Sequence, residues 1–307
     1  MAYNNFVPQL WAEKIDRDLN QNCVYAEDTN RQYEGTVKKC GDTVRITGVQ
    51  KPTIRTLVTY SGGTRVGAGT SNIEGPETQT GTEVVLVIDQ IRYFNFKVDD
   101  VDKAQALSGL MDALMAEANE ALAGEVDKYL AHIHVTGSEA DGYTAVTVDN
   151  ATTDGVTVST VTESSVTHDT ILDAFDKAQQ KLYEQNVNPS TEVVITIPPA
   201  VYRLFRKAYV LRDTDNSEIM KNGKVGKYGN MTVKLTNTVA KESDGEYHIQ
   251  VKTKRAIAYA QPLRHVEAYR PEGGFADAVK GFILFGAKVV RPKEIVDLAL
   301  TVATSAA

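Results

Sequence analysis

The amino-acid sequence predicts a protein of the α+β class, and three observations lead to that prediction. Helical and extended patterns follow one another in irregular succession. Two arms rich in β-branched residues flank a segment at 61–81 that is dominated by Gly, Thr and Ser. A helical pattern of about 30 residues begins near residue 99, well beyond the usual three turns. These features predict a tongue-like loop and a long helix attached to an α+β body.

The composition is that of an ordinary folded protein. A chain of 307 residues can bury a substantial core, and hydrophobic residues make up 42% of it and charged residues 24%. No apolar run approaches the roughly 18 residues of a membrane helix, so no membrane partner is expected. The net charge of −7 argues against a surface devoted to nucleic acid. Cys23 and Cys40 show no pairing pattern, which indicates synthesis in a reducing cytoplasm.

The N-terminal part predicts an arm at 1–30. Trp11, Ile15 and Leu19 recur at helical spacing, which indicates a short amphipathic helix in this arm.

An extended β-hairpin loop is expected at 31–98. Val44 and Ile46 alternate with polar neighbours, the period-two pattern of a half-exposed strand. The return arm, "TEVVLVIDQIRYFNFKVDD", is rich in β-branched and aromatic residues. On it, one face carries Phe94, Phe96 and Val98, which we expect to anchor the arm; plain core packing within the subunit is the alternative interpretation.

The long helix is expected within residues 99–135, and its helical pattern of about 30 residues at 1.5 Å each gives a length of roughly 45 Å. Asp99, Asp100 and Asp102 lie near its first turn, where carboxylates complement the helix dipole; a catalytic carboxylate cluster is the weaker interpretation. The apolar face consists of Val101, Ala104, Leu107, Met111, Leu114, Ala118, Leu122, Val126, Tyr129 and Ile133.

A second compact region follows a Thr/Ser-rich segment. Residues 136–168 predict a linker or an inserted hairpin. Within 169–260, Thr170 and Asp173 form a capping box at the start of a helix. A buried strand follows, and Pro198–Pro199 begins a further helix.

The final strands are expected at 261–295, where they return to the sheet beside the long helix, and 296–307 is expected to be a C-terminal tail. A connection around 271–281 joins these strands. Gly281 suits a turn in it, and Gly286 suits a bend or bulge.

No catalytic or cofactor motif is complete in this sequence. The phosphate-binding P-loop, G-x-S-x-G and H-E-x-x-H are absent, and Asn72 replaces the third glycine of a dinucleotide fingerprint. His132 and His134 would lie about 200° apart on a helix, so an exposed helix end is expected rather than a shared metal ion. The sequence therefore predicts a protein that is not an enzyme and has no metal or cofactor.

One basic loop allows two interpretations. Lysines beside an aromatic residue can bind phosphate and stack a base. Because the chain as a whole is acidic and a solvated loop needs no ligand, nucleic-acid contact is the weaker interpretation. The loop carries Lys221, Lys224, Lys227 and Tyr228.

Four strings resemble the major capsid proteins of tailed bacteriophages, with the Hong Kong 97-type fold. They are "GDTVRI", "LVIDQIRYFNFKVDDVDKAQA", "VVITIPPAVYRLF" and "VEAYRPEGGFADAVKGFILFGAKVVRP". The resemblance covers nearly the whole chain in order, apart from the segment 136–168.

The resemblance implies how the segments are used. An N-terminal arm and an extended loop would precede a peripheral domain with the spine helix, an axial domain and return strands of the peripheral domain. These correspond to 1–30, 31–98, 99–135, 169–260 and 261–295.

The resemblance also implies partners. Copies would assemble as hexamers and pentamers into an icosahedral shell around double-stranded DNA, which they contact non-specifically. Scaffolding and portal proteins are expected, with minor or decoration capsid proteins as further candidates. The protein would be found in the virion after assembly in the bacterial host cytoplasm.

The candidate contact residues follow from this architecture. The candidates for the subunit interface are Arg65, Arg92, Tyr93, Phe94, Phe96, Lys280, Lys288 and Arg291. Lys221, Lys224, Lys227 and Tyr228 are candidates for contacts of an axial loop. Two other classes stay open: an encapsulin-type compartment that encloses a cargo enzyme, and a cytoplasmic enzyme whose active-site residues come from distant segments.

Overall fold

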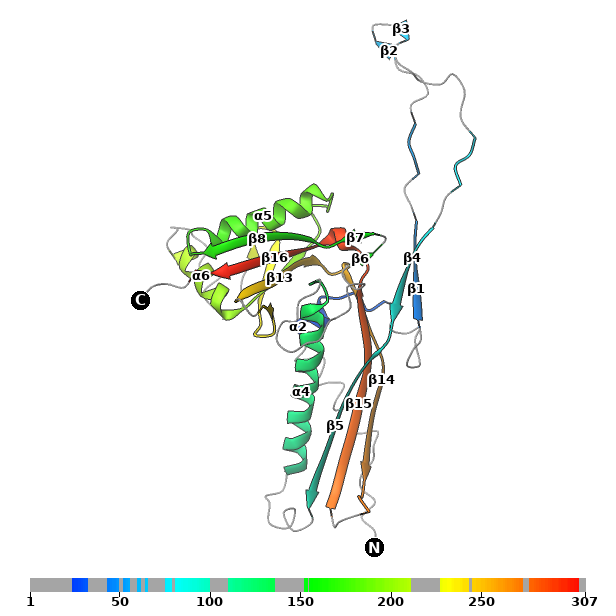
Figure 1. Cartoon of the computed structure of the whole chain (residues 1–307), viewed down its shortest axis with the longest axis vertical. Helices are drawn as coiled ribbons and strands as arrows, with labels where there is room; N and C mark the ends of the chain where they lie inside the picture. Colours follow the sequence, from blue (N-terminus) through cyan, green and yellow to red (C-terminus); the bar gives the residue numbers. More distant parts are fainter. Residues whose placement is uncertain are drawn as a thin grey trace. The chain divides into compact units, whose positions relative to one another are not determined.

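The computed structural model describes residues 24–32, 43–49, 52–55, 60–61, 64–65, 75–78, 81–99, 110–135, 152–153, 155–210, 227–242, 245–272 and 276–303 (Figure 1). Trp11, Ile15 and Leu19, on which the helix predicted in the N-terminal arm depends, lie outside these ranges, so that helix stays a prediction. Helices and strands follow one another irregularly, which confirms the α+β class. The chain divides into two compact units, one of residues 45–85 and one of residues 1–44 with 86–307. No described helix is long and apolar enough to cross a membrane.

The smaller unit is built from short β pairs. Strand β1 pairs with β4, and β2 pairs with β3. These strands are β1 (Thr43–Val49), β2 (Tyr60–Ser61), β3 (Thr64–Arg65) and β4 (Gly81–Val87), and two residues of β1 and two of β4 belong to the larger unit. Val44 and Ile46 are buried while their polar neighbours are exposed, which confirms the predicted alternation. The Thr53 hydroxyl donates a hydrogen bond to the Glu77 carboxylate at 3.0 Å.

The first sheet of the larger unit is three-stranded and antiparallel, in the order β14–β15–β5, and the long helix α4 lies alongside it (Figure 1). The elements are β5 (Gln90–Asp99), α4 (Leu110–His132), β14 (Ile257–Tyr269) and β15 (Ala276–Val289). Tyr129 of α4 meets Phe285 of β15 edge to face, with 5.3 Å between ring centroids. The predicted return strands are confirmed, and so is the long helix from Leu110 to His132. Asp99, which we expected near the first turn of this helix, is instead the last residue of β5, because it pairs with Ala276 of β15.

The second sheet is mixed and seven-stranded, in the order β10–β11–β9–β13–β16–β8, with β12 paired to β13. Helices α5 and α6 cover one face, where Phe175 and Phe205 enter the core. Its elements are β8 (Ser159–Val166), α5 (Ile171–Glu184), β9 (Val193–Ile197), α6 (Pro199–Val210), β10 (Lys227–Tyr228), β11 (Met231–Leu235), β12 (Ala240–Lys241), β13 (Glu246–Thr253) and β16 (Ile295–Val302).

Short elements complete the larger unit. They are α2 (Val24–Glu27), β6 (Thr152–Thr153), β7 (Val156–Thr157) and the 3-10 helix η5 (Pro292–Glu294). The Asp127 carboxylate of α4 accepts hydrogen bonds from the backbone N–H groups of Val24 and Tyr25, both at 3.2 Å, which holds α2 against α4.

Several local predictions in the larger unit differ from the structure. Residues 296–302 form most of β16, with Val296 to Leu300 buried, rather than a tail, because both neighbouring strands and α5 cover them. Within 136–168, the segment predicted as a linker or an inserted hairpin, β6 and β7 form a short antiparallel pair, but residues 159–166 form β8 and pair with β16 rather than forming a linker. Thr170 precedes α5 as expected but makes no capping bond, because its hydroxyl accepts from the backbone N–H of Thr167 instead. The other domain boundaries stay predictions.

Candidate functional site

Strand β5 lies at the edge of the three-stranded sheet and shows two different faces. It pairs with β15 on one side, and no described strand pairs with its other side. Side chains alternate along β5: Tyr93 is 77% exposed and Ile91 47% exposed, whereas Phe94 and Phe96 are half-buried. The register places Lys280 opposite Asn95, so Lys280 lies on the same face as Tyr93. We call the face that carries Tyr93 and Lys280 the outer face, and the face on which α4 packs the inner face.

Phe94 and Phe96 belong to the inner face. Their rings stack at 5.8 Å between centroids and pack with Met115, Val266 and Val279 in a small core. Together with buried Val98 they share one face, as predicted, but their described contacts are within the subunit. Core packing within the subunit is thus confirmed, and the interface role of Phe94 and Phe96 stays a prediction.

Gly281 lies within β15, opposite Phe94, and not in a turn as predicted. A Cβ at this position would lie 2.6 Å from the Phe94 ring. The glycine is therefore needed because the Phe94 ring lies directly against the strand backbone. The connection between β14 and β15 falls at 270–275, which is shorter than predicted.

Replacing Phe94 with aspartate is expected to lower the free energy of unfolding of the isolated subunit by about 2 kcal/mol, because it removes a half-buried ring and places a carboxylate among apolar side chains. Urea denaturation of the unassembled protein measures the change. The control is Tyr93→Asp, the same charge one residue away on the exposed face, which should change the free energy by less than about 0.5 kcal/mol. Equal effects of the two variants would contradict the two-faced description of β5.

The basic candidates for the interface are not gathered in one place. Arg92 lies on the inner face, 3.7 Å from the Glu125 carboxylate of α4. Lys280 lies on the outer face, 3.0 Å from Glu267. The remaining three are Arg291, which pairs with Glu294 at 2.8 Å, Lys288, which is half-buried in β15, and Arg65, which belongs to β3. Exposed ion pairs contribute only about 0–1 kcal/mol, so a partner can replace them at little cost.

The axial-loop candidates are only partly described. Lys227 and Tyr228 form β10 at the edge of the seven-stranded sheet, while Lys221 and Lys224 lie outside the described residues. The Tyr228 hydroxyl donates to Asp176 at 2.8 Å, and its ring packs edge to face on Phe175. Tyr228 thus packs at the edge of the core beside α5, and both its hydroxyl and its ring make contacts within the subunit.

The second face of the seven-stranded sheet carries a buried histidine–carboxylate network. The prediction of an exposed helix end at His132 and His134 is wrong, because both are buried. His134 Nε2 lies 3.2 Å from one oxygen of Asp297 in β16. His248 Nδ1 of β13 lies 2.8 Å from the other oxygen. One buried carboxylate thus joins the end of α4 to two strands of the sheet.

The hydrogen bonds of Gln250 fix the protonation of His134. The Gln250 amide nitrogen donates to the Leu130 carbonyl at 2.7 Å and lies 2.9 Å from His134 Nδ1. A nitrogen that receives a donor carries no proton, so the proton of His134 resides on Nε2 and is donated to Asp297. His248 likewise donates its Nδ1 proton to Asp297, because an ionised carboxylate only accepts.

The network shifts the pKa of two groups. Burial alone would raise the pKa of the Asp297 carboxyl, but the hydrogen bonds from His134 and His248 outweigh it and lower the pKa to about 2. Burial disfavours charge on His248, yet the hydrogen bond to Asp297 and the charges of Asp297, Glu242 and Glu246 raise its pKa. Asp297 is therefore ionised at neutral pH.

Sequence reasoning missed this network, although two signals pointed to it. In "YHIQVKT", His248 and Gln250 alternate with Ile249 and Val251, the pattern of a strand with one polar face. Asp297 is the single charge within the apolar run "IVDLALTV". A charge in such a run is expected to have buried partners.

Comparisons with known proteins agree with this architecture. A model of the phage capsid protein family matches residues 81–298. The fold is similar to that of a chain of Mycobacterium phage Che8, with a TM-score of 0.71, 23% identity, and coverage of 97% of this chain and 98% of that one. A chain from the capsid of cyanophage P-SCSP1u gives a TM-score of 0.62 at 15% identity, covering 87% of this chain and 85% of that one. No curated protein matches the sequence.

The long helix beside a three-stranded sheet, together with the separate mixed sheet, defines a shell subunit of the Hong Kong 97 type, which confirms the predicted fold. The chain belongs to the phage capsid protein family. It is a major capsid protein of a tailed bacteriophage, a structural subunit of the homo-oligomeric icosahedral shell of the virion.

The compartment alternative is not favoured. The finding against it is the match of the phage capsid protein family model to residues 81–298. The fold is also similar to that of a virus-like particle from Pyrococcus furiosus, with a TM-score of 0.53 at 13% identity, covering 94% of this chain and 98% of that one.

Proposed function

We propose that the subunit assembles as hexamers and pentamers around double-stranded DNA, and that the outer face of the β5 edge contacts a second copy of the chain. The observation that carries this proposal is the exposure of Tyr93 and Ile91 on an edge strand of a subunit whose family forms shells. Exposed apolar side chains on an unpaired edge favour association. The domain assignments made from the sequence are part of the same proposal.

The smaller unit supports a role between subunits. Ile54 in this unit is 90% exposed, which is unfavourable for a large aliphatic side chain unless a partner covers it. Contact with a neighbouring copy would remove this surface from water. We include the extended loop at 31–98 in the proposed interface for this reason.

The further partners in the proposal are a scaffolding protein, a portal protein and packaged DNA, with assembly in the host cytoplasm. The acidic net charge of −7 suits DNA contact that is sparse and non-specific. Electron microscopy of the purified protein, alone and co-expressed with its neighbouring phage genes, tests the proposal. Capsomers or closed shells with nuclease-protected DNA are expected in the phage context, and a monomer at high concentration in both preparations would overturn it.

Replacing Tyr93 with aspartate is expected to raise the protein concentration needed for assembly by roughly tenfold or more, because a buried interface tyrosine typically contributes over 1 kcal/mol. Light scattering during assembly measures the effect. Tyr93→Phe keeps the apolar ring and should assemble like the wild type. Normal assembly of Tyr93→Asp would place the interface elsewhere.

A further inference from the structure

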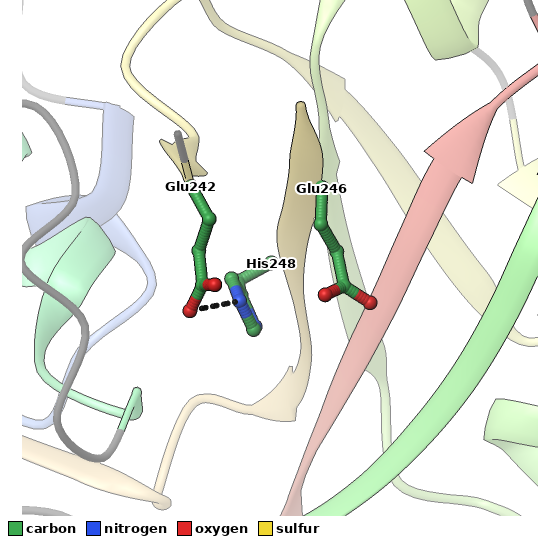
Figure 2. Close-up of side chains that lie close together, drawn as sticks. All are labelled: Glu242, Glu246 and His248. Atoms are coloured by element: carbon green, nitrogen blue, oxygen red, sulfur yellow. Dashed lines mark hydrogen bonds and ion pairs between the residues drawn. The ribbon is translucent and has the colours of Figure 1, made fainter. Parts of the chain in front are cut away.

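A group of three possible metal ligands lies at the turn between β12 and β13. Glu242 follows β12, Glu246 opens β13, and His248 comes two residues later. Figure 2 shows the two glutamates on either side of the His248 ring, and one ligand atom from each residue lies within 4.8 Å of the others. The turn itself brings them together: Glu242 N–H donates to the Glu246 carbonyl at 2.8 Å, and Gly245 has a φ of +93°.

The orientation of the His248 ring is fixed by Asp297. Because Asp297 accepts a hydrogen bond from Nδ1–H, the other ring nitrogen, Nε2, faces the turn. Nε2 lies 3.2 Å from Glu242 Oε1. In the neutral imidazole both atoms carry lone pairs, so this approach requires something positive between them. A proton meets that requirement, and so does a cation.

We propose that His248 Nε2 and the carboxylates of Glu242 and Glu246 bind a divalent cation of the Zn²⁺ type, with Asp297 orienting the histidine from behind. This goes beyond the shell function and concerns the subunit alone. One imidazole and two carboxylates are a ligand set that suits zinc, whereas calcium and magnesium prefer oxygen alone. A carboxylate on the far nitrogen of a metal-binding histidine is the usual arrangement around such sites.

The surrounding charge favours a cation at this place. Glu242, Glu246 and Asp297 bring three carboxylates around one imidazole, and the proton of His134 is already committed to Asp297. His248 is buried, while both glutamates are half-buried, so an ion can reach the site from solvent and still be held at the sheet. The bound ion would fasten the β12–β13 turn to the sheet.

Glu246 distinguishes the two possibilities for what lies between His248 Nε2 and Glu242, a proton or a metal cation. A proton shared between His248 and Glu242 leaves no need for Glu246, whereas a cation uses it as the third ligand. Glu246→Gln is therefore the decisive variant, because the described contacts of His248 to Asp297 and Glu242 remain in it.

The test is a titration of the full chain, free of a histidine tag, with Zn²⁺. Cys23→Ser and Cys40→Ser are introduced first, because thiolates bind zinc strongly. Isothermal calorimetry should find one Zn²⁺ per subunit, and Zn²⁺ should raise the melting temperature, since a ligand that binds only the folded state stabilises it. Glu246→Gln should bind at least about tenfold more weakly. Glu184→Gln, which changes an exposed glutamate of α5, should bind like the parent.

Absorption spectra with Co²⁺ provide a second measurement. Weak visible bands from nitrogen and oxygen ligands should appear with the parent and be lost with Glu246→Gln, while circular dichroism verifies that the variant is folded. Failure of the parent to bind Zn²⁺, or equal binding by Glu246→Gln and the parent, would overturn the proposal and leave a protonated histidine between Asp297 and Glu242.

Discussion

Replacing Asp297 with asparagine is expected to lower the free energy of unfolding by about 4 kcal/mol, the largest effect that we expect from a single substitution in this protein. The buried carboxylate accepts hydrogen bonds from the ring N–H groups of His134 and His248. The asparagine side chain has the same shape, but its oxygen accepts hydrogen bonds whereas its NH₂ group only donates them. One histidine N–H therefore loses its acceptor and faces an N–H group instead. Urea denaturation of the unassembled subunit measures the loss.

The control for Asp297→Asn is Asp169→Asn. Asp169 also lies beside a histidine, His168, at 3.5 Å, but its side chain is 78% exposed. Water replaces the lost contact there, so the change should be below about 0.5 kcal/mol. A similar small effect at Asp297 would show that the buried network contributes little.

The same carboxylate predicts the acid dependence of stability. Its pKa lies at about 2 in the folded protein against 3.8 for the unperturbed group, so its contribution is complete above pH 3.8 and is lost as the pH falls toward 2. A shift of this size corresponds to about 2 kcal/mol. The difference in unfolding free energy between the wild type and Asp297→Asn should therefore narrow by about that amount between about pH 5 and pH 2.

Replacing Gly286 with alanine is expected to lower the free energy of unfolding by about 3 kcal/mol, because the added methyl group has no room. A Cβ at Gly286 would meet the carbonyl oxygen of Val87 and lie 2.9 Å from the Cα of Ile88. Both obstacles are backbone atoms, so a side-chain rotation cannot relieve the clash. Chemical denaturation of the isolated subunit checks the prediction.

The matched control is Gly124→Ala in α4. A Cβ at Gly124 meets nothing within 4 Å, and alanine is a better helix former than glycine by about 1 kcal/mol. This variant should be as stable as the wild type or more so. If Gly286→Ala were as stable as Gly124→Ala, the backbone of Val87 and Ile88 would not lie as close to β15 as described.

Periodicity predicted those elements whose pattern is local. Helix α5, the buried strand β9 and the Pro199 start of α6 follow from residues within a few positions of one another, and the structure confirms them. The resemblance to capsid proteins predicted the fold because its strings extend over most of the chain. The successes for α5, β9 and α6 thus depend on information that is present along one short segment.

The failures share a different cause. The exposed end predicted for α4 was wrong because the partners of His134 are distant: Gln250 is 116 residues away and Asp297 is 163 residues away. The tail predicted at 296–307 was wrong for most of its described part because β16 is covered by strands from elsewhere in the chain. Gly281 was assigned to a turn because nothing beside it in the sequence reveals the ring of Phe94. In each case the deciding contact is tertiary.

The position of β16 in the seven-stranded sheet has a consequence for biosynthesis. This strand lies between β13 and β8, so the sheet joins residue 159 to residue 302 and remains in two pieces until the ribosome has made β16. Pairings between such distant segments form late and slowly, because a large loop must close first. A nascent chain therefore cannot finish this sheet before residue 302 has been made. We therefore expect a copy that lacks β16 to present an incomplete sheet, with β8 separated from β13.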